Sequence, residues 1–283
     1  MAATLLPAYL PARLPAQVAG DVASLPGSTR SAGLAGAGVA LVGDAGSIFA
    51  NPAAIATIRH VALEGSYEEY PAGATLSSAA AAVGVGPFAY GAGVHVLRPA
   101  PETGQPSDML ALSALVFRFG MIALGTSLKY VREGLAIPKV EAWTGDVGAA
   151  IALFDIFALG ASVENLGGKF AAGAHLPRRT RVGFTMNFAD PQGSGRLLTT
   201  VEGQWPEGRP SVIVAGAEGG IVTRGGVGII ARIGVSGKTS SIDMSPFAVG
   251  AGIKLGELQL DYAYRSYVAP NGGGHRLGVR WTP

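Results

Sequence analysis

The feature that most constrains the fold is an alternation of apolar residues with polar or small ones in short segments. Within residues 257–267, Leu258 and Leu260 fall on one face of an extended chain, and Gln259 and Asp261 fall on the other. A β-strand separates odd and even positions in this way, whereas a helix would mix the two sets. The same alternation recurs in three further segments, at residues 88–98, 181–188 and 247–255.

The composition places these strands in a membrane protein. Only 14% of the 283 residues are charged, against about 25% in an ordinary soluble domain, and the mean hydropathy is +0.35. The uncharged stretch 71–97 is long enough for a spanning helix, but glycines and the turn-like Val85-Gly86-Pro87 interrupt it. Because only helices and closed barrels satisfy every backbone group in lipid, the sequence predicts a β-barrel.

Applied to the whole chain, the alternation predicts an all-β fold, a fourteen-stranded antiparallel transmembrane barrel over residues 60–283. Links after even-numbered strands are mostly short and links after odd-numbered strands mostly longer, which is typical of bacterial outer-membrane barrels with periplasmic termini. The expected strands cover residues 60–69, 74–84, 88–98, 108–117, 121–131, 141–153, 156–164, 180–188, 196–204, 211–222, 226–236, 246–254, 257–267 and 275–282.

The face of the strands expected to point inward is rich in glycine and in charges of both signs. A wide aqueous pore does not require small inward residues, and glycine in a strand often marks the close approach of another backbone. We therefore expect the segment before the first strand to fill the lumen as a plug. The wall residues expected to pack against it are Gly91, Gly93, Gly250 and Gly252.

Residues 1–30 are predicted to form an extended arm, because a Leu-Pro-Ala repeat places a proline at every fourth position. This run is a poor signal peptide, so the sequence predicts that the export signal is missing from this numbering. The arm is expected to lie either on its own barrel or on a partner protein. Its candidate docking residues are Pro7, Tyr9, Pro11, Arg13 and Pro15.

Residues 31–59 are predicted to be the plug. They contain a glycine-rich start, the stretch Ala40-Leu41-Val42-Gly43-Asp44-Ala45 and the close Asn51-Pro52-Ala53. This order resembles the plug of FadL-like outer-membrane barrels, especially the PorV/PorQ branch. Three later stretches are similar to that branch as well: residues 164–167, residues 176–179 leading into 181–184, and residues 260–264 with 274–278. The resemblance marks four residues of the plug motif, Asp44, Asn51, Pro52 and Ala53.

The resemblance implies a non-enzymatic barrel that serves as the membrane-embedded partner of other envelope proteins in secretion or surface attachment. The alternative is a FadL-like channel for the uptake of hydrophobic small molecules, which predicts an apolar pocket on the outer side. The inward face is mostly glycine and charge, which favours the first hypothesis over the second. Outer-membrane lipid is an expected partner in both cases.

The sequence offers little for other chemistry. No serine lies in a nucleophile motif, so no catalytic residues and no enzyme activity are predicted. Cysteine is absent and the four histidines show no metal-ligand spacing, so neither a metal nor a cofactor is expected. A net charge of +2 without a basic run leaves no footprint for nucleic acid.

Overall fold

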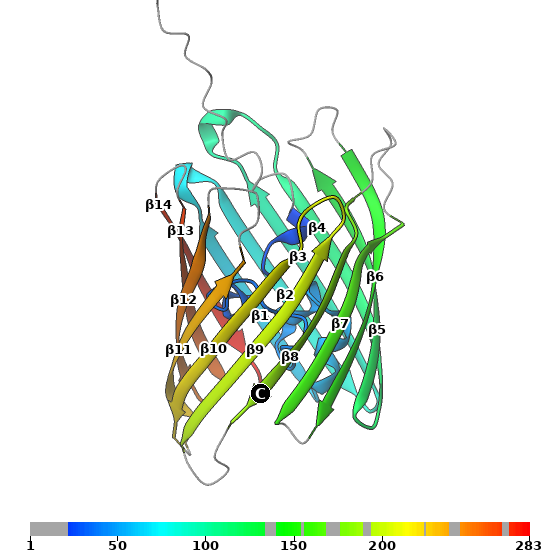
Figure 1. Cartoon of the computed structure of the whole chain (residues 1–283), viewed down its shortest axis with the longest axis vertical. Helices are drawn as coiled ribbons and strands as arrows, with labels where there is room; N and C mark the ends of the chain where they lie inside the picture. Colours follow the sequence, from blue (N-terminus) through cyan, green and yellow to red (C-terminus); the bar gives the residue numbers. More distant parts are fainter. Residues whose placement is uncertain are drawn as a thin grey trace, which may run out of the picture.

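The computed structural model describes residues 22–133, 140–153, 156–167, 176–188, 194–223, 225–237, 244–267 and 272–283. The described strands form one closed antiparallel barrel in which every strand pairs with its neighbours in the chain and β1 pairs with β14 (Figure 1). The predicted fourteen-stranded barrel is therefore confirmed. The predicted strand ends differ from those observed by at most three residues.

The strands have the following bounds: β1 (Val61–Glu69), β2 (Thr75–Val85), β3 (Phe88–Arg98), β4 (Asp108–Phe119), β5 (Ile122–Glu133), β6 (Val140–Leu153), β7 (Phe157–Leu166), β8 (Arg179–Asn187), β9 (Gly195–Pro206), β10 (Val212–Val222), β11 (Val227–Ser236), β12 (Met244–Leu255), β13 (Leu258–Tyr267) and β14 (Gly272–Trp281).

Alternation along each strand divides the barrel into an apolar outside and a polar inside. On β13, Leu260 is 42% exposed and its neighbour Asp261 only 3%. On β10, which looked apolar or small on both faces, Ile213 points outward while Val214 and Glu218 are buried. An apolar surface around a polar interior is the arrangement of β-barrels that span a membrane. No helix within the described residues is long and apolar enough to cross a membrane.

The two ends of the barrel differ in the length of their links. Two-residue links such as 86–87 and 256–257 join strands at the end where β14 finishes, which we call the short-link end. Links such as 99–107 join strands at the opposite, long-link end. The difference is not uniform: the links 70–74, 207–211 and 268–271 are short for the long-link end, and 188–194 is long for the short-link end.

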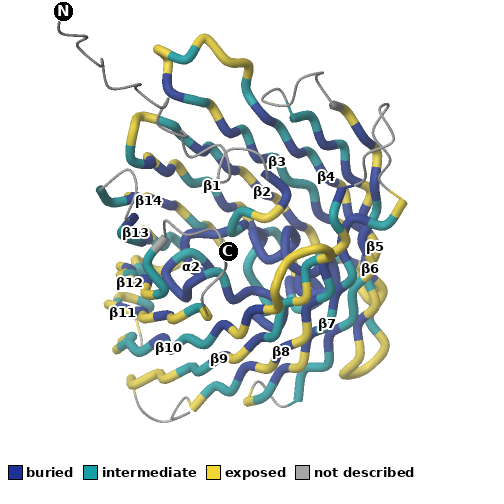
Figure 2. The backbone as a smooth tube through the Cα atoms, turned by 45° about the horizontal axis from the view of Figure 1, so that its top comes forward, coloured by how far each residue is buried: buried dark blue, intermediate teal, exposed yellow. Residues whose placement is uncertain are grey.

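Residues 22–58, which we call the inner segment, lie inside the barrel (Figure 2). The segment folds into four short helical elements, η1 (Val22–Ser24), α2 (Thr29–Gly33), η2 (Ala45–Phe49) and η3 (Pro52–Thr57). α2 packs against β11–β14, and η3 packs against β2–β7 on the other side of the lumen. Most of the segment is buried, so it occupies the space that inward glycines leave open.

The inner segment differs from the predicted plug at its start. Residues 22–30, which the sequence analysis assigned to the arm, lie in the lumen, and Val22 and Thr29 are at most 1% exposed. The physical reason is that wall arginines bond the backbone here: Arg179 donates to the Ala23 carbonyl at 3.1 Å, and Arg276 donates to the Pro26 carbonyl at 2.8 Å. Arg30 itself pairs with the wall, as described below. The five candidate docking residues of the arm, from Pro7 to Pro15, lie outside the described residues.

Candidate functional site

Arg30 is placed by a capped turn of helix at the centre of the lumen. The Ser28 hydroxyl accepts a hydrogen bond from the Ser31 backbone N–H at 2.9 Å, which caps α2 at its start. From α2, the Arg30 guanidinium donates to both carboxylate oxygens of Glu218 on β10, each at 2.9 Å. It also donates to Asp44 at 2.7 Å. One arginine thus ties two parts of the inner segment to the wall.

These contacts belong to a closed ring of six alternating charges, which we call the ion ring. Asp44 pairs with Arg280, and the Arg280 Nε lies 2.8 Å from Asp261. Arg232 closes the ring with pairs of 2.6 Å to both Asp261 and Glu218. In order around the ring, the members are Arg30, Asp44, Arg280, Asp261, Arg232 and Glu218.

The ion ring is electrically neutral and mostly shielded from water. Three guanidinium groups face three carboxylates, and each group has a partner on both sides. Burial alone would raise the pKa of the Asp44 carboxyl. The charges of Arg280 and Arg30 outweigh burial and hold that pKa well below its usual range. Asp44 is therefore a carboxylate across the physiological pH range and links the inner segment to β14.

Glu202 on β9 holds the inner segment on another side. Its carboxylate accepts hydrogen bonds from the backbone N–H groups of Gly38 and Val39, both at 2.8 Å. Arg181 on β8 pairs with the same carboxylate at 2.6 Å and donates to the Gly36 carbonyl at 2.8 Å. Charged wall residues therefore bond the backbone of the segment directly, which fixes its path through the lumen.

The Asn51-Pro52-Ala53 motif forms the start of η3. The Asn51 side chain accepts from the Ala53 N–H at 3.0 Å, and its amide group donates to the carbonyls of Val39 and Ala149 at 2.8 and 3.0 Å. Pro52 occupies the first turn, where its missing N–H costs nothing. A Cβ on Gly125 would lie 2.7 Å from the Ala53 nitrogen. The motif is thus a packing and hydrogen-bonding unit against β5 and β6.

Three of the four wall glycines singled out in the sequence lie against the inner segment. A Cβ on Gly91 would lie 2.7 Å from Ile48 Cδ1, and one on Gly93 would lie 2.5 Å from Phe49 Cζ. Gly250 lies beside Gly33, whose Cα would be 3.3 Å from such a Cβ. Gly252 differs from the prediction. The atoms nearest to it belong to the wall residues Asp261, Gln259 and Arg232, because the ion ring fills the space beside it.

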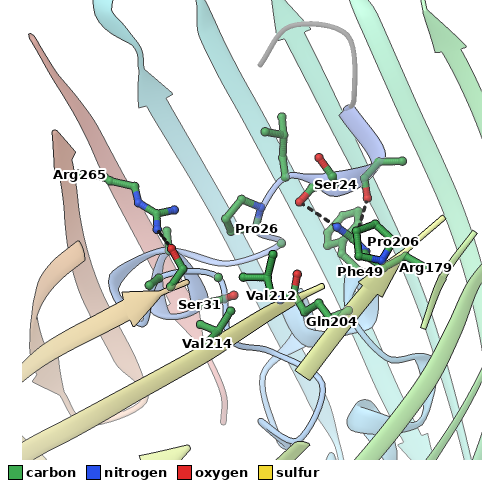
Figure 3. Close-up of a pocket in the computed structure, with 18 of the residues that line it drawn as sticks. Ser24, Pro26, Ser31, Phe49, Arg179, Gln204, Pro206, Val212, Val214 and Arg265 are labelled. Atoms are coloured by element: carbon green, nitrogen blue, oxygen red, sulfur yellow. Dashed lines mark hydrogen bonds between the residues drawn. The ribbon is translucent and has the colours of Figure 1, made fainter. Parts of the chain in front are cut away.

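A cavity of about 370 Å³ lies on the long-link side of the inner segment (Figure 3). Its floor is made by residues of the segment, including Pro26, Ala32 and Phe49, and Val212 and Val214 of β10 line its side. Arginine and tyrosine side chains contribute polar groups to the rest of its wall. The volume falls in the range of small-molecule sites, about 300–1,000 Å³. Among the described residues, no cluster of side chains could hold a metal ion.

No family model matches this sequence, and no curated protein matches it. Solved structures match its fold. A Pseudomonas aeruginosa FadL homologue gives a TM-score of 0.59 at 14% identity, over 90% of this chain and 98% of that one. The Pseudomonas putida toluene transporter TodX gives 0.57 at 10% identity, over 91% and 97%. This chain therefore has the fold of the FadL-type barrels.

The structural comparison supports the resemblance to FadL-like barrels only. Neither of these two barrels is a PorV or PorQ protein, so the finer assignment to that branch gains no support from them. The sequence analysis also missed two members of the ion ring, Arg30 and Glu218. Arg30 stood in the predicted arm, and Glu218 stood in a strand without a clear polar face.

Proposed function

We propose that this protein is an outer-membrane channel for small hydrophobic molecules and that the cavity beside the inner segment is its binding site. The observation that carries the proposal is the position of this cavity. It lies between the long-link end and the inner segment that fills the lumen. A solute entering from that end meets the cavity first. The inner segment acts as the plug that the solute must pass.

Two further observations support the proposal. The fold is that of a FadL homologue and of a toluene transporter. Longer links face the outside in bacterial barrels, so in our proposal the cavity is on the outer side and the end of β14 is in the periplasm. The lining mixes apolar groups with arginines, so it departs from the purely apolar pocket expected of a hydrocarbon channel. The secretion role and its protein partners stay predictions from the sequence resemblance.

The test is ligand binding to the purified barrel in lipid nanodiscs. The probe is 4-fluorotoluene, followed by fluorine NMR saturation transfer against empty nanodiscs. Ala32→Trp places a large side chain in the cavity from the floor, and we expect it to abolish specific binding. Ala251→Trp adds the same side chain to the outer face of β12 and should leave binding unchanged. Equal signals from wild type and Ala32→Trp would contradict the assignment of the site.

A further inference from the structure

The walls of the cavity carry an unbalanced charge. Among the described residues that line it are Glu68 and the arginines Arg179, Arg181, Arg265 and Arg276. Arg179 and Arg181 pair with Glu164 and Glu202, which are not part of the lining, and Glu68 pairs with Arg276 at 3.3 Å. Three carboxylates thus balance three of these four arginines. A site that only had to hold a neutral hydrocarbon would gain nothing from this excess, because buried charge without a partner is costly.

Arg265 of β13 is the arginine whose charge is left over. Within the described part of the chain, its side chain donates to the Ser245 carbonyl at 3.0 Å and to the Ser236 hydroxyl at 2.7 Å. Neither partner is a carboxylate. A guanidinium carries five N–H donors, and these two bonds use two of them. Three donors remain on a cation at the edge of the cavity (Figure 3).

A break in the sheet sets the position of Arg265. The pairing of β12 with β13 shifts between Met244 and Ala248, which leaves the Ser245 carbonyl available to the arginine. Ser236 ends β11 and its hydroxyl also bonds the Pro246 carbonyl at 3.4 Å. Bulges commonly re-aim a side chain in this way. The guanidinium is therefore held in place before any ligand arrives, which lowers the entropy cost of binding.

Apolar groups line the cavity next to the arginine. Val212, Val214 and Pro26 belong to its lining (Figure 3), and Val214 pairs across the sheet with Ser236, which Arg265 bonds. Tyr267 also lines the cavity and is largely buried beside Arg265, with its ring edge-on to Tyr70 at 6.0 Å. A cavity of about 370 Å³ with a cation at one side and aliphatic and aromatic groups around it fits a compact ring that bears one acidic group.

We propose that the cavity binds compact aromatic carboxylates and that Arg265 recognises the carboxylate group. A guanidinium fork matches the two oxygens of a carboxylate and forms paired, charge-assisted hydrogen bonds. This inference rests on the proposed function, because it names the class of solute for the same cavity. It adds that an anionic ring binds better than the neutral ring of the same shape.

The experiment compares 4-fluorobenzoate with 4-fluorotoluene in nanodiscs of neutral lipid at pH 7, by the fluorine NMR assay described above. The two probes share the fluorinated ring and differ only in the group opposite the fluorine, which is a carboxylate in one and a methyl group in the other. We expect 4-fluorobenzoate to bind roughly tenfold more tightly or better, since a hydrogen bond to a charged group contributes about 1.5–3 kcal/mol. In Arg265→Gln the affinity for 4-fluorobenzoate should fall by the same factor, whereas 4-fluorotoluene should bind as before. Arg265→Lys should recover part of the loss.

Arg196→Gln is the matched control, because it removes one positive charge from an exposed side chain at the start of β9. Equal affinities for the two probes, or an Arg265→Gln variant that keeps the preference for 4-fluorobenzoate, would overturn the inference. In both cases binding of 4-fluorotoluene would leave the proposed function intact. Binding of neither probe to the wild type would overturn the proposed function itself. Retained 4-fluorotoluene binding in Arg265→Gln also shows that this variant is folded.

Discussion

Removal of one carboxylate from the ion ring should loosen the inner segment without unfolding the barrel. Asp44→Asn keeps the shape of the side chain and removes its charge, so three guanidinium groups then face two carboxylates. Breaking a buried ion pair by removing one partner costs about 3–5 kcal/mol. Arg30 and Arg280 each keep one other partner, Glu218 and Asp261. We therefore expect the lower end of this range, about 3 kcal/mol.

This cost should fall on opening of the inner segment, because Asp44 takes no part in the ladder between strands. A change of about 3 kcal/mol raises the opening equilibrium on the order of a hundredfold. Hydrogen exchange with mass spectrometry over residues 29–56 measures it directly. Glu257→Gln, at an exposed turn between β12 and β13, is the control and should leave exchange unchanged.

A second substitution tests whether the ring acts as a unit. Arg280→Gln added to Asp44→Asn leaves two guanidinium groups facing two carboxylates. The double variant should therefore lose less protection than the sum of the two single variants. Additive losses would show that the ring members act independently. Exchange in Asp44→Asn at the wild-type rate would refute the claim that the ion ring holds the segment.

Two further predictions concern the same segment. Arg280 and Arg30 hold the pKa of Asp44 below its unfolded value, against the opposing effect of burial. The Asp44 carboxylate therefore stabilises the inner segment above the unfolded pKa of about 4, and this stabilisation is lost as the pH falls below that value. Exchange of residues 29–56, corrected for the intrinsic rate at each pH, should accelerate below about pH 4 in the wild type and less so in Asp44→Asn; parallel curves would contradict this. Gly93→Leu should expose residues 22–58 to protease and lower heat resistance by overpacking Phe49, at a cost of about 1–3 kcal/mol or more, whereas Ala92→Leu on the outer face of the same strand should change neither. Unchanged protease protection in Gly93→Leu would show that Phe49 does not need the space above that glycine.

The strands could be predicted because their signal is local. Alternation along residues 257–267 depends only on which side chains face lipid, and the period of two is visible in the sequence alone. The same alternation places Arg232, Asp261 and Arg280 on the polar faces of their strands, and all three side chains lie in the lumen.

The ion ring could not be predicted because its pairs form when the inner segment packs against the barrel wall. The period of two along a strand carries no information about that packing. Arg30 and Glu218 are 188 residues apart, and no local pattern connects them. β10 looked apolar or small on both faces, so the sequence did not show which of its faces points inward. The inward direction of Glu218 follows only from the pairing of β10 with β9 and β11. The shape of the cavity depends on how the inner segment folds. The alternation along the strands does not determine that fold.

The most direct test of the proposed function is a crystal structure of the purified barrel grown with 4-bromotoluene, whose bromine can be located by anomalous scattering. We expect one ordered bromine site in the cavity, between Pro26 of the inner segment and Val212 and Val214 of β10. Bromine found only on the outer apolar surface, with the cavity empty at saturating probe, would contradict a binding site at this position.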